Sequence, residues 1–112
     1  MKIYHRSVDD ITILDLEGQI TIGEGDVQLR EAIHKLVEIG QKRILLNMAR
    51  VTYMDSSGVG ELMACLQHIQ EHEGQFKLLN ISKKIKNLLF IAQILSIFEY
   101  FNDEELAVAS FN

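Results

Sequence analysis

Apolar and polar residues near the start of the chain alternate with the period of β-strands. Residues 11–16 are rich in β-branched side chains and alternate enough to form a strand, and residues 2–7 are expected to pair with them. Asp9 and Asp10 lie between the two runs, and aspartate favours tight turns. The sequence therefore predicts that the chain opens with an antiparallel hairpin.

Three later segments also predict strands. Residues 44–46 and 76–79 form short continuous apolar runs, as expected for central strands covered on both faces. Residues 97–101 form a third run, near the end of the chain. We expect all three to join the hairpin in one sheet.

Between these strands the apolar residues follow the spacing of helices. Leu29 to Val37 repeats at intervals of three and four residues, and Gly40 is expected to end this first helix. Val59 to Ile69 repeats in the same way and predicts a second helix that ends before Gly74.

Two further helices are predicted in the last third of the chain. Ser82 is a suitable N-cap for the third. Its inner face would carry Ile85, Leu88, Leu89, Ala92 and Leu95. The fourth helix is expected to begin at Asn102, with Glu105 three residues later as in a capping box.

Strands that alternate with helices predict an α/β fold with a mixed, mainly parallel β-sheet and about four helices. The chain has 112 residues, of which 47% are hydrophobic, which suits one domain over residues 1–112. A chain of this length buries enough surface to form a core without disulfide staples. Cys65 is the only cysteine, so the chain can form no internal disulfide or cysteine-rich zinc site, and a reducing compartment is expected.

The net charge and the hydropathy of the sequence argue against a nucleic-acid-binding domain and against a secreted or membrane-spanning protein. Eleven basic and sixteen acidic side chains give a net charge of −5, the wrong sign for a domain that binds nucleic acid directly. No signal-peptide pattern opens the sequence, and the longest apolar stretch, residues 87–98, is too short to span a bilayer. We therefore expect a cytoplasmic protein with no membrane insertion.

The most informative segment joins the central strand to the second helix. Open α/β sheets usually keep their sites at such a connection, and here Asp55, Ser56 and Ser57 precede Gly58 and Gly60. The glycines lower helix propensity and leave the backbone uncovered, so a partner could approach closely. The same residues also fit a purely structural role, in which Asp55 or a serine caps the helix and the glycines allow packing.

The segment Asp55-Ser56-Ser57-Gly58-Val59-Gly60, preceded by Tyr53-Met54, resembles the phosphorylation loop of bacterial anti-sigma factor antagonists, which are members of the STAS domain family. The resemblance extends over almost the whole chain, from Leu16-Glu17-Gly18 to Asp103-Glu104-Glu105-Leu106-Ala107. It implies a STAS-like fold and a binding module that is not an enzyme.

The same resemblance implies how the module works. An anti-sigma factor with serine kinase activity would phosphorylate Ser56, and the unphosphorylated protein would sequester that kinase and so free a sigma factor. A phosphatase that resets Ser56 is implied as a further partner. No cofactor or metal is expected. The implied partner-binding residues are Tyr53, Met54, Asp55, Ser56, Ser57, Gly58 and Val59.

Three positions depart from the family pattern. Thr21 stands where many relatives carry an aspartate, and Ile81-Ser82 lacks the proline that is common before the third helix. Ile94 stands where the family often has a helix-ending glycine. A second hypothesis fits the same family: a structural STAS-type subunit of a transporter or sensory assembly, in which the serine loop serves docking alone.

The motif His68-x-x-Glu71-His72 matches the pattern of inverted zinc peptidases. Glu61, Cys65 and the two histidines would share one narrow wedge of the second helix. No third carboxylate ligand is evident, so we interpret this wedge as a solvated flank of the helix and Cys65 as a partly buried packing residue.

Other catalytic motifs fit poorly. Met54 replaces the first glycine of the G-x-S-x-G elbow, so Ser56 is not expected to act as a hydrolase nucleophile. Gly23-Glu24-Gly25 lacks the lysine and hydroxyl residue of a P-loop. Lys83, Lys84 and Lys86 could meet an acidic partner but equally fit a solvated helix face.

Overall fold

The computed structural model describes residues 1–111 and opens with the expected hairpin. Strands β1 (Lys2–Val8) and β2 (Ile11–Ile20) pair in antiparallel register. Asp9 and Asp10 connect them with φ angles of 49° and 71°. Two successive positive φ angles match the right-handed twist of the strands, and aspartate tolerates that region better than most residues.

The strands form one mixed sheet in the order β1-β2-β3-β4-β5. After the hairpin, β3 (Arg43–Met54), β4 (Gln75–Leu79) and β5 (Tyr100–Phe101) all pair in parallel. This confirms the predicted α/β class. The predicted lengths of β2 and β3 were wrong, since both strands continue beyond their apolar runs through polar residues that the pattern did not mark.

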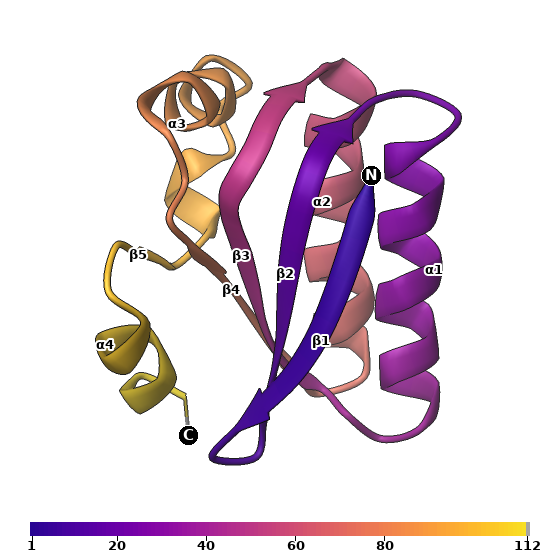
Figure 1. The fold of residues 1–112 in the computed structure, drawn as a ribbon, viewed down its shortest axis with the longest axis vertical. Helices are drawn as coiled ribbons and strands as arrows, with labels where there is room; N and C mark the ends of the chain where they lie inside the picture. The colour runs from indigo at the N-terminus through magenta and orange to yellow at the C-terminus, as the bar shows by residue number, and fades with distance from the viewer. Residues whose placement is uncertain (112) are drawn as a thin grey trace.

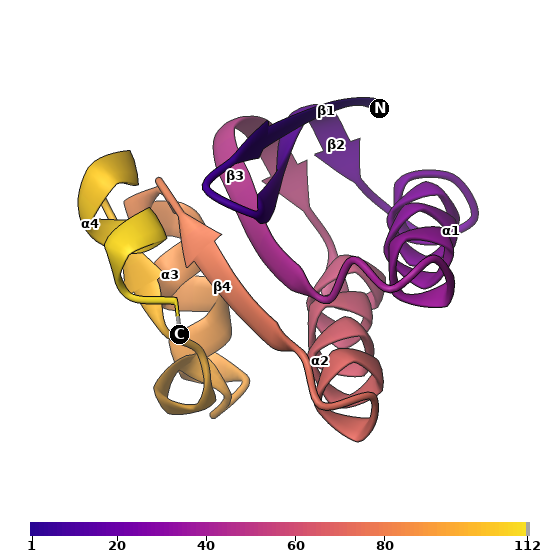
Figure 2. The same cartoon turned by 90° about the horizontal axis from the view of Figure 1, so that it is seen from below.

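Helices α1 (Gly25–Glu38) and α2 (Ser56–Glu71) lie side by side on one face of the sheet (Figures 1 and 2). Both begin earlier than the apolar spacing predicted, because their first turns are polar or glycine-rich. The main core between helices and sheet is aliphatic and fully enclosed, with Leu14, Ile33, Leu46 and Leu62 all inaccessible to solvent.

Helix α3 (Lys83–Ile91) begins at the predicted cap, where the Ser82 hydroxyl accepts a hydrogen bond from the Ile85 amide. The helix ends before the predicted Ala92 and Leu95. Gln93 has a φ of 63°, the left-handed conformation that ends many helices. The chain then forms a 3₁₀ turn at Leu95–Ile97, so the predicted strand shortens to β5.

Helix α4 (Glu104–Ala109) packs on the opposite face of the sheet from α1 and α2 (Figure 2). The predicted cap, Asn102, was wrong by one residue: Asp103 is the N-cap, and its carboxylate accepts from the Glu105 amide. Lys77 of β4 is buried beneath this helix. Its Nζ donates to the carbonyl and hydroxyl oxygens of Ser110, at 2.8 and 2.9 Å.

Among the helices in residues 1–111, none combines the length and the apolar composition that a bilayer crossing requires.

Candidate functional site

The end of β3 and the start of α2 form the loop singled out by the sequence. Met54 closes the strand and is buried, whereas Ser56 opens the helix and is exposed. Asp55 between them has extended backbone and caps the helix. The start of α2 lies at the same end of the molecule as α3 and the connection from β2 to α1 (Figure 1).

Asp55 ties two parts of this site together. Its Oδ1 accepts a hydrogen bond from the Gly58 amide and its Oδ2 accepts one from the Ile22 amide, each at 3.0 Å. These two bonds, the first above all, hold the pKa of the Asp55 carboxyl below its usual range. One carboxylate therefore caps α2 and also fixes the connection that precedes α1.

Ser56 and Ser57 differ in exposure. Ser56 is exposed, and within residues 1–111 its hydroxyl has no hydrogen-bond partner. Ser57 is half-buried. Because Asp55 already caps the helix, the Ser56 hydroxyl is not needed to hold the loop.

The two glycines of the loop have different surroundings. A Cβ atom at Gly58 would collide with the Ile20 carbonyl oxygen and the Met54 side chain, so this glycine is required for packing. A Cβ at Gly60 would meet no atom within 4 Å. Gly60 is exposed and lies inside a helix, where glycine is unfavourable. Packing within residues 1–111 therefore does not explain why position 60 is a glycine.

An apolar groove runs beside Ser56, between α2 and α3, with a volume of about 610 Å³. Five of the predicted partner-binding residues line it: Tyr53, Met54, Asp55, Ser56 and Val59. Ser57 and Gly58, which were also predicted, do not line this groove.

The other groove residues were missed by the sequence reasoning: Gly60, Met63, Lys84, Leu88, Ile91, Ala92 and Ile94. Most of them belong to α3 or to the turn after it, about thirty residues away along the chain. The available signal in the sequence was the adjacent apolar pair Phe90 and Ile91, which lies off the predicted inner face of that helix. In the structure these residues are 68% and 67% accessible, and Ile91 lines the groove. Exposed apolar surface of this kind marks interaction sites.

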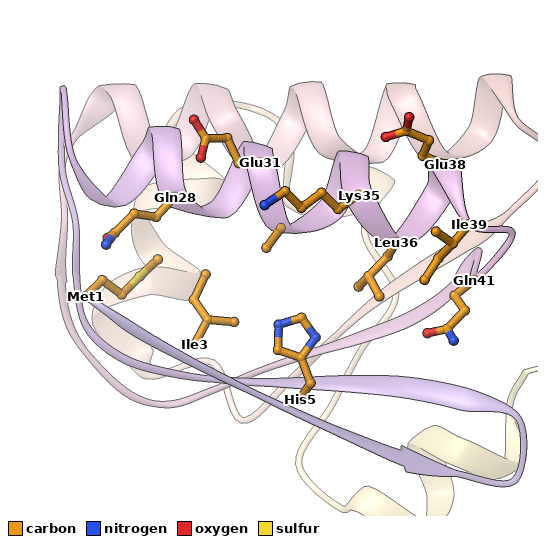
Figure 3. Close-up of a pocket in the computed structure, with 11 residues that line it drawn as sticks. Met1, Ile3, His5, Gln28, Glu31, Lys35, Leu36, Glu38, Ile39 and Gln41 are labelled. Atoms are coloured by element: carbon orange, nitrogen blue, oxygen red, sulfur yellow. The ribbon is translucent and has the colours of Figure 1, made fainter.

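A second hollow, of about 760 Å³, lies between the edge strand β1 and α1. Figure 3 shows Ile3 and His5 of β1 facing Lys35 and Leu36 of α1 across it. None of its lining residues belongs to the serine loop or to the groove beside Ser56.

The histidine motif of α2 does not form a metal centre. The rings of His68 and His34 stack with centroids 3.7 Å apart, and His72 lies beside His68 at 4.5 Å. In the part of the chain that the structure describes, no group of three or more potential ligands is arranged to hold a metal ion.

The interpretation of this wedge as a solvated flank was wrong for its first half. Glu61 and Cys65 are buried where α1 packs against α2. Arg30 of α1 donates to Glu61 at 2.7 Å, and the Cys65 thiol donates to the same carboxylate at 3.5 Å. Burial, with this carboxylate as neighbour, raises the pKa of Cys65 and keeps its thiol protonated.

This fold and loop agree with a known family. The STAS domain model matches residues 3–107, so the chain belongs to the STAS domain family. Within that family, the chain is 25% identical over 111 residues to BtrV of Bordetella bronchiseptica, which is named as an anti-sigma factor antagonist. That alignment covers 99% of this chain and 95% of BtrV.

Solved structures agree in fold. A protein of Thermotoga maritima, titled an anti-sigma factor antagonist, superposes with a TM-score of 0.89 at 21% identity and covers 97% of this chain and 93% of its own. The Bacillus cell fate determinant SpoIIAA, solved in its phosphorylated form, gives a TM-score of 0.74 at 22% identity, over 96% of this chain and 98% of its own.

Proposed function

We propose that this protein is an anti-sigma factor antagonist controlled by phosphorylation of Ser56. In its unphosphorylated form it binds an anti-sigma factor that is also its serine kinase, and so frees a sigma factor in the cytoplasm. A phosphatase resets Ser56. The protein acts by binding and catalyses no reaction itself.

One observation carries the proposal: the Ser56 hydroxyl is exposed and unbonded at the rim of an apolar groove. The fixed loop supports it, because Asp55 holds both the helix start and Ile22 without help from Ser56. The relatives named as anti-sigma factor antagonists support the choice of partner.

The chemistry of a switch follows from charge. Phosphoserine carries about −1.5 to −2 charges at neutral pH. Burying a dianion in an apolar interface costs several kcal/mol of desolvation, and a single cation offsets only part of its charge. Each 1.4 kcal/mol reduces affinity about tenfold. Asp55 adds like-charge repulsion beside the phosphate. Phosphorylation would therefore release the partner while the domain stays folded.

The test combines modification with binding. The protein is incubated with ATP and each anti-sigma kinase encoded in the same genome, and the phosphate is mapped by fragmentation mass spectrometry. We expect one phosphate, on Ser56, no phosphate on Ser56→Ala, and normal modification of the matched variant Ser57→Ala. Phosphate on Ser57 would contradict the assignment.

Calorimetric titration of the modifying kinase then compares the unmodified and phosphorylated proteins. We expect at least a tenfold loss of affinity upon phosphorylation. Equal affinities would favour the other STAS role, a structural subunit that docks through the loop without a switch.

A further inference from the structure

Three lysines open α3, and they differ in what they contact. Lys84 lines the groove that also holds Ser56, whereas Lys83 and Lys86 do not. The Lys84 ammonium lies 5.6 Å from the centroid of the Tyr53 ring. Within residues 1–111, no carboxylate pairs with Lys84. This contact with Tyr53 is near the outer limit of a cation–π interaction, which is about 6 Å.

Among the described residues that line the groove, Lys84 is the one cation and Asp55 is the only other charged group. Both Asp55 oxygens already accept backbone hydrogen bonds, from Gly58 and Ile22. A phosphate on Ser56 would thus meet a carboxylate that repels it and that already occupies amide donors of the helix start.

We infer that Lys84 is the phosphate-binding residue of the site, whose ammonium leaves the Tyr53 ring and pairs with the phosphate monoester on Ser56. Charge-assisted hydrogen bonds to phosphate are stronger than an exposed contact with an aromatic face. Both side chains are exposed and line the same groove, so each can change rotamer without disturbing the core.

An ion pair between Lys84 and the phosphate would change the shape of the groove as well as its charge. Ser56 lies on α2 and Lys84 on α3, so an ion pair between them would connect the two helices across a groove whose lining includes apolar residues such as Leu88. Phosphorylation would then remove apolar docking surface in addition to placing a charge beside it. This inference rests on the proposed function, since it assigns a second residue to the same switch.

The test does not require the kinase. Phosphoserine is incorporated genetically at position 56, and the phosphate is titrated by ³¹P NMR in the otherwise unchanged protein and in the variants Lys84→Gln and Lys83→Gln. Lys83 is the matched control because it is an exposed lysine of the same helix turn outside the groove. Circular dichroism melts check that all three proteins are folded.

An unpaired phosphoserine has a second pKa of about 6. We expect the phosphate pKa to be about one unit lower in the parent protein and in Lys83→Gln than in Lys84→Gln. The Tyr53 ring resonances should shift upon phosphoserine incorporation only where Lys84 is present. Equal phosphate pKa values in the parent and Lys84→Gln proteins would overturn the inference.

The two proposals can fail separately. If Lys84 lowers the phosphate pKa but no kinase modifies Ser56, the ion pair stands and the proposed function fails. If kinases modify Ser56 and lose affinity for the product, but Lys84→Gln leaves the phosphate pKa unchanged, the function stands and the role of Lys84 is wrong.

Discussion

The Asp55 carboxylate lies 3.0 Å from the backbone amide of Ile22, thirty-three residues earlier in the chain. The same side chain caps its own helix through Gly58. An aspartate at an N-cap ordinarily satisfies amides of one helix only. Here the second bond joins the serine loop to the connection between β2 and α1, so the two segments that flank Ser56 form one surface.

The double role of Asp55 can be separated by two substitutions. Asp55→Ala removes both acceptors, whereas Asp55→Asn keeps one acceptor oxygen and remains a good N-cap. Amide hydrogen exchange followed by NMR should show loss of protection at Ile22 in both variants, and at Gly58 only in Asp55→Ala. Unchanged exchange at Ile22 in Asp55→Asn would mean that the amide does not depend on this bond.

The pKa of Asp55 determines the pH range over which its contribution to folding stability changes. Its folded-state pKa lies below the ordinary value of 3.8. The carboxylate therefore stabilises the fold fully above the unfolded-state pKa, and the contribution is lost as pH falls through the lower, folded-state value. In urea unfolding, the difference in stability between wild type and Asp55→Ala should be constant near pH 7 and disappear in strong acid.

The sequence predicted most of this site locally and little of it globally. The apolar spacing and the oxygens of Asp55 and Ser56 predicted the start of a helix at this loop, whereas the assignment of phosphorylation to Ser56 came from the resemblance to the STAS domain family. The bond from Asp55 to Ile22 and the position of Lys84 opposite Ser56 could not be predicted, because spacing along one helix says nothing about its neighbours in space. The burial of Glu61 was missed for the same reason, and Cys65, which we expected to be partly buried, is fully buried because α1 packs against that flank.

The buried Lys77 gives a further prediction. Its ammonium binds Ser110 and pairs with Glu99 at 3.1 Å, so it joins the C-terminal segment to β4. Lys77→Met keeps an apolar stem but leaves the Ser110 carbonyl without its donor. We expect a loss of about 1–3 kcal/mol in unfolding free energy, with faster amide exchange in α4. Lys83→Met, the same change at an exposed lysine, should alter stability by less than about 0.5 kcal/mol.

The histidine stack between α1 and α2 predicts a dependence on pH. Burial lowers the pKa of His68 from its usual 6.5, and the neighbouring His34 and His72 lower it further, while Glu71 opposes them. The unfolded chain thus binds a proton at this position more readily than the folded protein does. Stability should fall as pH drops from above 6.5 through the folded-state pKa, and stay low below it.

Substitution isolates this effect from other titrating groups. His68→Gln removes the titration and keeps a polar side chain on the helix. Chemical unfolding at several pH values between 5 and 8 should show wild type losing stability relative to His68→Gln as the solution is acidified. Parallel curves for the two proteins would mean that His68 titrates alike in the folded and unfolded states.

The glycines of the serine loop yield the sharpest contrast between folding and binding. At position 58 an added methyl group meets the Ile20 carbonyl, so Gly58→Ala should cost about 1–3 kcal/mol of stability. At position 60 a methyl meets nothing, and alanine is the better helix former, so Gly60→Ala should gain about 0.5–1 kcal/mol. Urea unfolding of both variants measures these opposite signs.

Binding should respond in the reverse direction at Gly60. Because packing does not require this glycine, we expect it to allow the partner's backbone to approach the groove, so Gly60→Ala should weaken binding of the anti-sigma partner about tenfold while stabilising the fold. Ala64→Gly, one turn further along α2 at an exposed position outside the groove, should lose about the stability that Gly60→Ala gains and bind normally. Calorimetric titration of the three proteins decides the matter: if Gly60→Ala binds as tightly as wild type, the partner does not approach the groove at this helix turn.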